Sequence, residues 1–249
     1  MKNLNGKIAV VTGGSSGIGL ATARLFVERG AYVYITGRRA EELKIAESLI
    51  GRNVTAFQGD VSSSDDMERL YQIVGREKGH LDIVFANAGI GDLAPLGALN
   101  DKHIDSLFNV NVKGVIYTVQ KALPLLRPGS SIVLNASIVA SKGFPNWSVY
   151  SATKAAVRSF ARTWSSDLKG KGIRVNAVSP GVIVTPGHGT VGLTAEEVSA
   201  FLAYTASITP LEKSGSAEDV ANVVAFLASD DSKFIAGVEL FVDGGFAQI

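Results

Sequence analysis

Short apolar runs rich in β-branched residues alternate with helical stretches along the whole chain. The expected strands are residues 7–12, 32–36, 53–58, 81–86, 131–137, 173–179 and 238–242. The helices expected between them include residues 18–29, 40–50, about 101–126 and about 148–169. Continuous apolar strands that alternate with helices form a parallel sheet covered on both faces. Because no linker-like stretch interrupts the pattern, we expect one doubly wound α/β domain over residues 1–249, with a seven-stranded parallel sheet.

The composition excludes several classes of function. The formal net charge is +1 and basic residues form no block, so nothing favours binding to nucleic acid or to an anionic membrane. The absence of cysteine excludes disulfides and thiol catalysis, and the three histidines are too scattered to indicate a metal site. No stretch of 18 apolar residues occurs. We therefore expect a soluble cytoplasmic protein without a catalytic metal.

The segment TGGSSGIG, residues 12–19, lies between the first expected strand and the first expected helix. Glycines there permit a tight turn and let backbone N–H groups approach a diphosphate at the helix N-terminus. A strand-to-helix turn can also use glycines without binding anything, but this position favours a dinucleotide site. The residues of this loop expected to contact the cofactor are Gly13, Ser15, Ser16, Gly17, Ile18 and Gly19.

Further motifs follow in a fixed order: GDV at 59–61, NAG at 87–89, NVNVKG at 109–114, Ser137, YSATK at 150–154 and SPGVIVT at 179–185. Over nearly its whole length the chain resembles the short-chain dehydrogenase/reductase family. Within that family it looks most like bacterial NADP-dependent alcohol dehydrogenases that reduce ketones and aldehydes. The resemblance implies a Rossmann-type fold and an oxidoreductase that uses a nicotinamide cofactor.

The end of the second strand bears on the choice between NAD and NADP. Thr36 and Gly37 stand where an acidic residue would bind the ribose of NAD, and Arg38 and Arg39 follow. Arginine forms forked, charge-assisted hydrogen bonds with phosphate. Two arginines that merely begin a surface helix are the alternative, although positive charge opposes the dipole there. The sequence therefore favours NADP(H).

The family resemblance implies further contacts to the cofactor. Asp60 and Val61 are expected at the adenine, and Asn87, Ala88 and Gly89 beside the ribose. Asn87 could instead only stabilise a turn. The residues expected around the nicotinamide are Pro180, Gly181, Ile183 and Thr185.

Tyr150 and Lys154 are spaced i and i+4, so they share one face of a helix. A nearby ammonium favours the phenolate, and we expect Lys154 to lower the pKa of Tyr150 into the range of a general acid–base catalyst. The resemblance implies that Lys154 also binds the nicotinamide ribose, that Ser137 holds the substrate oxygen, and that Asn111 holds a water linked to the lysine. Taken singly, Tyr150 and Lys154 could be an ordinary helix pair. Ser137 could be a hydroxyl at a strand end and Asn111 a local kink. The joint order of the four residues favours catalysis.

A glycine-rich segment at about 185–210 follows the sixth strand and is expected to form a lid over the substrate. Its expected apolar residues are Val191, Leu193, Phe201 and Tyr204, and His188 is expected in an exposed loop. Ile138, Phe144 and Trp147 could line the opposite wall. Lys142 is the only cation in these stretches, so we expect a small neutral ketone, aldehyde or alcohol. Two alternatives remain. One is a ketoreductase that acts on acyl chains bound to a carrier protein, and the other is a regulator that only binds NADPH.

The resemblance also implies a homotetramer of D₂ symmetry. The helices near 101–126 and 148–169 would pair with their copies, and the C-terminus would lie near a second two-fold axis. Val149, Val157, Phe160 and Trp164 offer apolar surface for the core and for this interface.

Overall fold

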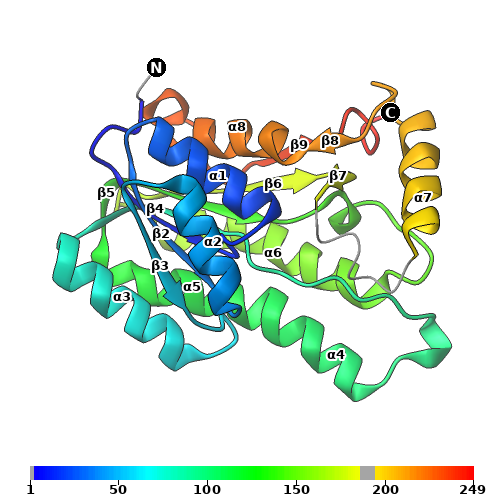
Figure 1. The fold of residues 1–249 in the computed structure, drawn as a ribbon, viewed down its shortest axis with the longest axis horizontal. Helices are drawn as coiled ribbons and strands as arrows, with labels where there is room; N and C mark the ends of the chain where they lie inside the picture. Colours follow the sequence, from blue (N-terminus) through cyan, green and yellow to red (C-terminus); the bar gives the residue numbers. More distant parts are fainter. Residues whose placement is uncertain (1–2, 186–193) are drawn as a thin grey trace.

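A seven-stranded parallel sheet forms the centre of the computed structural model, which describes residues 3–185 and 194–249. The strand order is β3-β2-β1-β4-β5-β6-β9 (Figure 1). The strands are β1 (Ile8–Thr12), β2 (Tyr32–Gly37), β3 (Val54–Gln58), β4 (Leu81–Ala86), β5 (Leu126–Asn135), β6 (Arg174–Pro180) and β9 (Glu239–Val242). This is the predicted doubly wound sheet.

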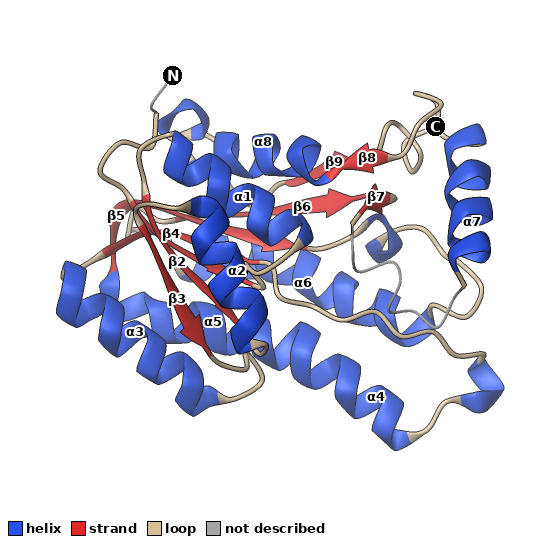
Figure 2. Ribbon diagram, viewed as in Figure 1, coloured by secondary structure: helices blue, strands red, loops and turns tan. Residues whose placement is uncertain are grey.

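Helices cover both faces of the sheet (Figure 2). One face packs against α1 (Gly17–Glu28), α2 (Ala40–Ile50) and α8 (Ala217–Ala228). The other packs against α3 (Ser64–Lys78), α5 (Gly114–Ala122) and α6 (Ser148–Asp167). Alternate residues of a strand point to opposite faces, so Val10 joins the second layer while its neighbour Val11 joins the first. Because each face has its own apolar layer, both sets of alternating residues in the central strands are mainly apolar.

The strand order reverses between β1 and β4, and this reversal positions the site. From β1 the chain builds outward through β2 and β3, then crosses back to β4 and continues to β9. Connections leave the two neighbouring strands in opposite directions there, which opens a crevice at their carboxyl ends. The glycine loop after β1 and the NAG segment after β4 both lie at this crevice.

Both predicted boundaries of strand β5 were wrong. Strand β5 begins at Leu126, not at residue 131, and its pairing with β4 shifts between Leu81 and Ile83. Pro128 and Gly129 break the apolar pattern in that first part of β5, which hid it in the sequence. Ser137 does not end β5, but follows it by two residues and caps the short 3₁₀ helix Ile138–Ala140.

The helix expected over 101–126 is divided. It consists of α4 (Asp101–Phe108), a π-helical turn (Asn109–Lys113), α5 and a 3₁₀ turn (Leu123–Leu125). A second, two-stranded sheet was also not predicted: β7 (Ile183–Val184) pairs with β8 (Gly215–Ser216). Two residues a strand are too short to give a periodic signal. In the described part of the chain, no helix combines the length and the apolar character needed to cross a membrane.

Candidate active site

The glycine loop between β1 and α1 requires glycine at specific positions. Gly13 and Gly17 have φ angles of 64° and 52°, in the left-handed region that favours glycine. Gly19 lies inside α1, where a Cβ atom would overlap the carbonyl oxygen of Gly13 and lie 2.7 Å from Nδ2 of Asn87. Gly19 therefore lets the helix pack against the loop, and it does not line the cavity described below.

Two asparagine side chains join the carboxyl ends of β1, β4 and β5. Asn87 Nδ2 donates to the carbonyl oxygens of Thr12 (2.9 Å) and Gly13 (3.3 Å). Asn87 Oδ1 accepts from Nδ2 of Asn135 at 2.9 Å. Asn87 is thus more than a local turn residue, because its side chain joins the glycine loop to the carboxyl ends of β4 and β5.

A cavity of about 310 Å³ occupies the crevice. Most of the predicted cofactor residues line it: Gly13, Ser15, Ser16, Gly17, Ile18, Arg38, Arg39, Asp60, Val61, Asn87, Ala88, Gly89 and Thr185. Sequence reasoning did not assign Thr36, Gly37, Gly59, Ile90 and Val110, which line it as well. The only indication of these residues in the sequence was that they lie next to or near assigned ones. Glycine-lined backbone and an extended cavity at a helix N-terminus suit a dinucleotide.

Arg38 and Arg39 are part of this cavity's lining, and both are exposed. Within residues 3–185 and 194–249, neither guanidinium has a hydrogen-bond or ion-pair partner. Arg39 is the residue before α2 and its side chain makes no capping hydrogen bond. A structural role for these two side chains is thus not apparent, whereas two free guanidinium groups beside a cavity can bind a phosphate.

Tyr150 and Lys154 project from the first turns of α6 toward the carboxyl edge of the sheet. The Lys154 Nζ lies 5.7 Å from the centroid of the Tyr150 ring and donates to the carbonyl oxygen of Asn135 at 2.8 Å. A Cβ atom on Gly89, which lines the cavity, would lie 3.5 Å from the same Nζ. The lysine thus lies near both the tyrosine and the cavity, although neither residue is part of the cavity lining.

The pKa of Tyr150 differs from the sequence-based expectation. Removal from water raises the pKa of Tyr150 to about 12, and the hydrogen bond with the Ser137 hydroxyl offsets only part of this rise. Burial also lowers the pKa of Lys154 to about 8. The expected lowering of the Tyr150 pKa is therefore not found in this structure, because removal of the phenol from water outweighs the hydrogen bond with Ser137.

Asn111 lies within the π-helical turn and is 1% exposed. Its Oδ1 accepts from the Ile90 backbone N–H at 2.9 Å, and its Nδ2 donates to the Ile90 carbonyl oxygen at 2.9 Å and to Thr153 Oγ1 at 3.1 Å. The helix irregularity considered for Asn111 is therefore present, whereas its role in holding a water stays a prediction. The irregular turn directs its amide to the segment after β4 and to α6.

The residues expected at the nicotinamide have different surroundings. Thr185 lines the cavity, but Pro180, Gly181 and Ile183 do not. Pro180 pairs with Val242 of β9, and a Cβ atom on Gly181 would lie 2.8 Å from Cα of Asp243. Ile183 is buried in the core. In this structure these three residues support the segment that leads to Thr185.

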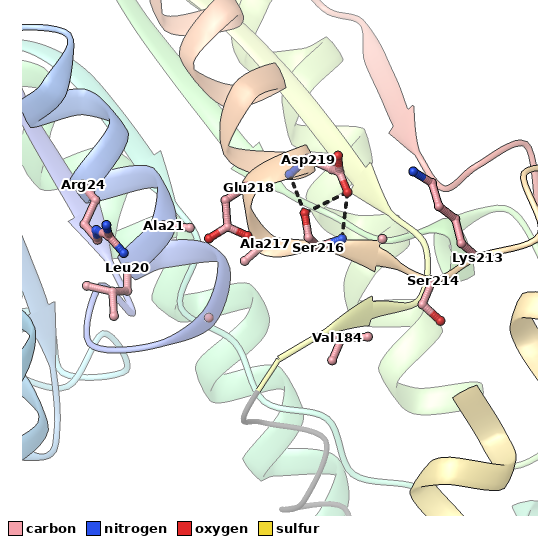
Figure 3. A pocket seen from close by; sticks show the side chains of 12 residues that line it. Leu20, Ala21, Arg24, Val184, Lys213, Ser214, Ser216, Ala217, Glu218 and Asp219 are labelled. Carbon is pink, nitrogen blue, oxygen red and sulfur yellow. Dashed lines mark hydrogen bonds between the residues drawn. The ribbon is translucent and has the colours of Figure 1, made fainter. Parts of the chain in front are cut away.

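A larger hollow of about 720 Å³ lies between α1, α8 and the β7–β8 pair (Figure 3). Arg24 and Lys213 lie on opposite sides of it. The Asp219 carboxylate in its wall accepts from the backbone N–H and the hydroxyl of Ser216, both at 2.8 Å, and so caps α8. Its described lining includes Lys213, Ser214 and Ser216 but no tyrosine that could act as a proton donor, so we do not assign catalysis to this hollow.

The lid is described in part. Helix α7 (Ala195–Ser207) begins with a capping box between Thr194 and Glu197. Phe201 and Tyr204 on this helix are 36% and 63% exposed. Val191, Leu193 and His188 lie outside the described residues.

Replacing Lys154 by Met should stabilise the folded protein at neutral pH by about 1–3 kcal/mol while removing activity. The folded state holds the Lys154 ammonium at a depressed pKa of about 8, below the usual value of 10.5, so protonation opposes folding. This penalty is complete below pH 8 and disappears as pH rises to 10.5, because only the unfolded chain is protonated in that window. The advantage of Lys154→Met should shrink across the same window.

Urea unfolding of both proteins at pH 7 and pH 10 measures this difference. Lys169→Met, at an exposed position, controls for the general effect of removing a lysine. Equal unfolding free energies for wild type and Lys154→Met at pH 7 would contradict the burial penalty.

Comparison with known proteins agrees with this geometry. The family model described as enoyl-(acyl carrier protein) reductase matches residues 13–247. The oxidoreductase asL5 of Sarocladium schorii is 45% identical, over 100% of this chain and 99% of that protein. The 3-oxoacyl-[acyl-carrier-protein] reductase FabG of Thermotoga maritima is 37% identical, over 97% and 98%.

Solved structures agree as well. A short-chain dehydrogenase/reductase from Brucella melitensis, titled glucose/ribitol dehydrogenase, superposes with a TM-score of 0.93 at 34% identity, covering 99% of both chains. A short chain dehydrogenase from Burkholderia cenocepacia J2315, in complex with NADP, gives a TM-score of 0.90 at 34% identity, covering 99% of this chain and 100% of that one. With its sheet order, its glycine loop and these relatives over nearly its full length, the chain belongs to the short-chain dehydrogenase/reductase family of oxidoreductases.

Proposed function

We propose that this protein is an NADP(H)-dependent oxidoreductase that interconverts neutral ketones or aldehydes with alcohols. One observation carries the proposal: the Ser137–Tyr150–Lys154 group lies near a cavity whose lining includes two arginines that have no side-chain partner among the described residues. This arrangement combines a proton donor for a carbonyl oxygen with a site for a phosphorylated dinucleotide.

The bound nicotinamide would supply a hydride to the carbonyl carbon in reduction and accept one in oxidation. Tyr150 donates its phenolic proton to the substrate oxygen as the carbonyl becomes an alcohol, and takes it back in the reverse reaction. Ser137 orients the substrate oxygen and the phenol by hydrogen bonding. Because its pKa lies near 12, Tyr150 is protonated at neutral pH and suited to reduction. Lys154 and Asn111 keep the surroundings of this proton transfer polar.

The arginines support NADP(H) over NAD(H). Both guanidinium groups are free within the described part of the chain, and no acidic residue ends β2. The relative from Burkholderia cenocepacia, whose solved structure contains NADP, offers a precedent within the family.

The contacts of Lys142 support a neutral substrate. Its ammonium donates to the carbonyl oxygen of Phe246 at 2.8 Å, so a substrate carboxylate would have to share it with this contact. Ile138, Phe144 and Trp147 form an apolar cluster with Tyr150. A carbonyl compound with apolar substituents suits these surroundings better than an anionic one.

Reduction of a 3-oxoacyl chain on a carrier protein is the second candidate. The relative from Thermotoga maritima has this activity in its name, and the matching family model names a carrier protein. A panel of free ketones and one 3-oxoacyl carrier protein, each assayed with NADPH and NADH, tests both candidates. Turnover of the carrier-bound chain alone would replace our proposal with the second candidate.

We also propose a homotetramer, formed through α4, α5 and α6. Phe160 and Trp164 on α6 stack with ring centroids 4.5 Å apart and are only partly buried in one protomer. Val157 is fully buried in the core, which is one of the two places expected for the apolar residues of this helix.

We expect light scattering at micromolar protein to give four times the protomer mass of 26.1 kDa. Phe160→Glu should lower the mass to that of a dimer or monomer, because it places a charge in an apolar contact. If the wild-type protein has the mass of a monomer, the proposed tetramer is refuted.

A further inference from the structure

The last residues of the chain fold into a tight turn beside the catalytic helix. The Asp243 carboxylate accepts from the backbone N–H groups of Gly245 (2.9 Å) and Ala247 (2.8 Å). The Phe246 N–H donates to the Asp243 carbonyl oxygen at 3.2 Å. These bonds bury the Phe246 side chain, which is 7% exposed. Residues 243–247 are called the C-terminal turn below.

A row of four aromatic rings connects the C-terminal turn to the catalytic tyrosine. Phe246 stacks on Phe144 with centroids 5.9 Å apart and planes inclined by 15°. Phe144 contacts Trp147 at 6.2 Å, and Trp147 meets Tyr150 edge-on at 5.4 Å. These distances are within the range for favourable aromatic pairs. The position of Trp147 therefore depends on support from both ends of the row.

Lys142 fixes the far end of the row. Its Nζ donates to the Phe246 carbonyl oxygen at 2.8 Å and lies 4.4 Å from the centroid of the Phe246 ring. A cation at this distance from a ring face is attracted to it. Lys142 comes from the loop between Ser137 and Tyr150, so one side chain joins the catalytic loop to the end of the chain.

The C-terminal turn also contacts the elements on the other sides of the site. A Cβ atom on Gly181 would lie 2.8 Å from Asp243, and one on Gly244 would lie 2.7 Å from Thr209 Cγ2. The Leu211 N–H donates to the Gly244 carbonyl oxygen at 3.2 Å. The turn is thus held between the segment after β6 and the segment after α7.

We propose that Lys142 is a positioning residue that, by holding the C-terminal turn, keeps Trp147 beside Tyr150 as a flat apolar wall for substrates with a ring next to the carbonyl. This inference rests on the proposed carbonyl reduction. Flat rings stack on such a wall, whereas a short acyclic ketone covers little of it. Lys142 should therefore affect binding of ring ketones far more than it affects the chemical step.

The test uses Lys142→Met, which keeps an unbranched side chain but removes the ammonium, and Lys142→Arg, which retains a cation. We expect Lys142→Met to raise KM for the bicyclic ketone 1-tetralone about tenfold, with kcat and the KM for 2-butanone changed by less than about twofold. Lys142→Arg should restore most of the loss. Phe246→Leu should reproduce the effect, and Lys169→Met, at a distant exposed site, should have none.

A second readout does not depend on activity. The chain has two tryptophans, so Trp164→Phe leaves Trp147 as the only one. In that background, Lys142→Met should make Trp147 fluorescence easier to quench with acrylamide, and Lys142→Arg should not. Unchanged quenching, or equal rises in KM for both ketones, would overturn the positioning role. If no ketone is reduced but quenching changes as expected, the wall is supported and the proposed function fails.

Discussion

Tyr150→Phe should lower kcat for ketone reduction by about 10²–10⁴, the range attached to general acid–base catalysis, while the fold and cofactor binding are retained. The substitution removes one oxygen atom from a ring that remains packed against Trp147. Because the donor is lost and the ring is kept, the effect should appear in kcat much more than in the dissociation constant for NADPH. Single-turnover reduction and NADPH fluorescence titration measure the two quantities separately.

Tyr117→Phe serves as the matched control, because Tyr117 belongs to α5 and packs against the core of the sheet. It should leave kcat within about twofold of wild type, as expected for a substitution outside the site. Turnover by Tyr150→Phe close to that of the control would exclude Tyr150 as the proton donor.

Replacing Arg38 and Arg39 together by glutamine should weaken NADPH strongly and NADH hardly at all. Each charge-assisted hydrogen bond to a phosphate contributes roughly 1.5–3 kcal/mol, and solvent exposure reduces this value. The two together should still shift the NADPH/NADH preference in kcat/KM by well over tenfold. Gly37→Asp should shift it further, because a carboxylate repels a 2′-phosphate and accepts hydrogen bonds from the ribose hydroxyls of NAD.

The structure can accommodate that aspartate. A Cβ atom on Gly37 would be 3.4 Å from Ser15 Oγ and 3.7 Å from Leu43, which are ordinary contacts, and Gly37 is not among the residues with positive φ. Arg52→Gln, at an exposed position after α2, controls for the loss of positive charge. Assays at fixed ionic strength are needed, because salt screens arginine–phosphate contacts. Equal losses with both cofactors, or a wild-type preference for NADH, would refute the assignment.

The sheet and most of the cofactor cavity were predictable from the sequence, since both depend on local patterns. Buried parallel strands are continuous apolar runs, and parallel connections bring all of their carboxyl ends to one edge. Knowing that the glycine loop follows β1 and that Asn87 follows β4 was therefore enough to place them together. The glycine-loop residues and the two arginines in the cavity lining were named from position and chemistry, whereas Asp60, Val61, Asn87, Ala88, Gly89 and Thr185 were named through the family resemblance.

Features that depend on packing between distant segments were not predictable. The first part of β5 pairs through an irregular stretch with Pro128 and Gly129, and its apolar pattern is broken. The pKa of Tyr150 depends on how much water the fold removes from it, which i, i+4 spacing does not reveal. The contact between Lys142 and Phe246 joins residues 104 positions apart. Roles assigned to Pro180, Gly181 and Ile183 by resemblance remain predictions, because this structure shows only their packing.

Because of the π-helical turn at Asn109–Lys113, the position of Asn111 depends on the exact number of residues between α4 and α5. A π turn accommodates one residue more than an α turn, at the cost of poorer hydrogen-bond geometry. Deleting a residue such as Val110 would let α4 and α5 join as one regular helix. Because the π turn absorbs this extra residue, α4 and α5 would keep their relative phase, but the bulge that carries Asn111 would be lost. Asn111 would lose its register with Ile90 and Thr153, so a deletion that improves the helix would dismantle this side of the site.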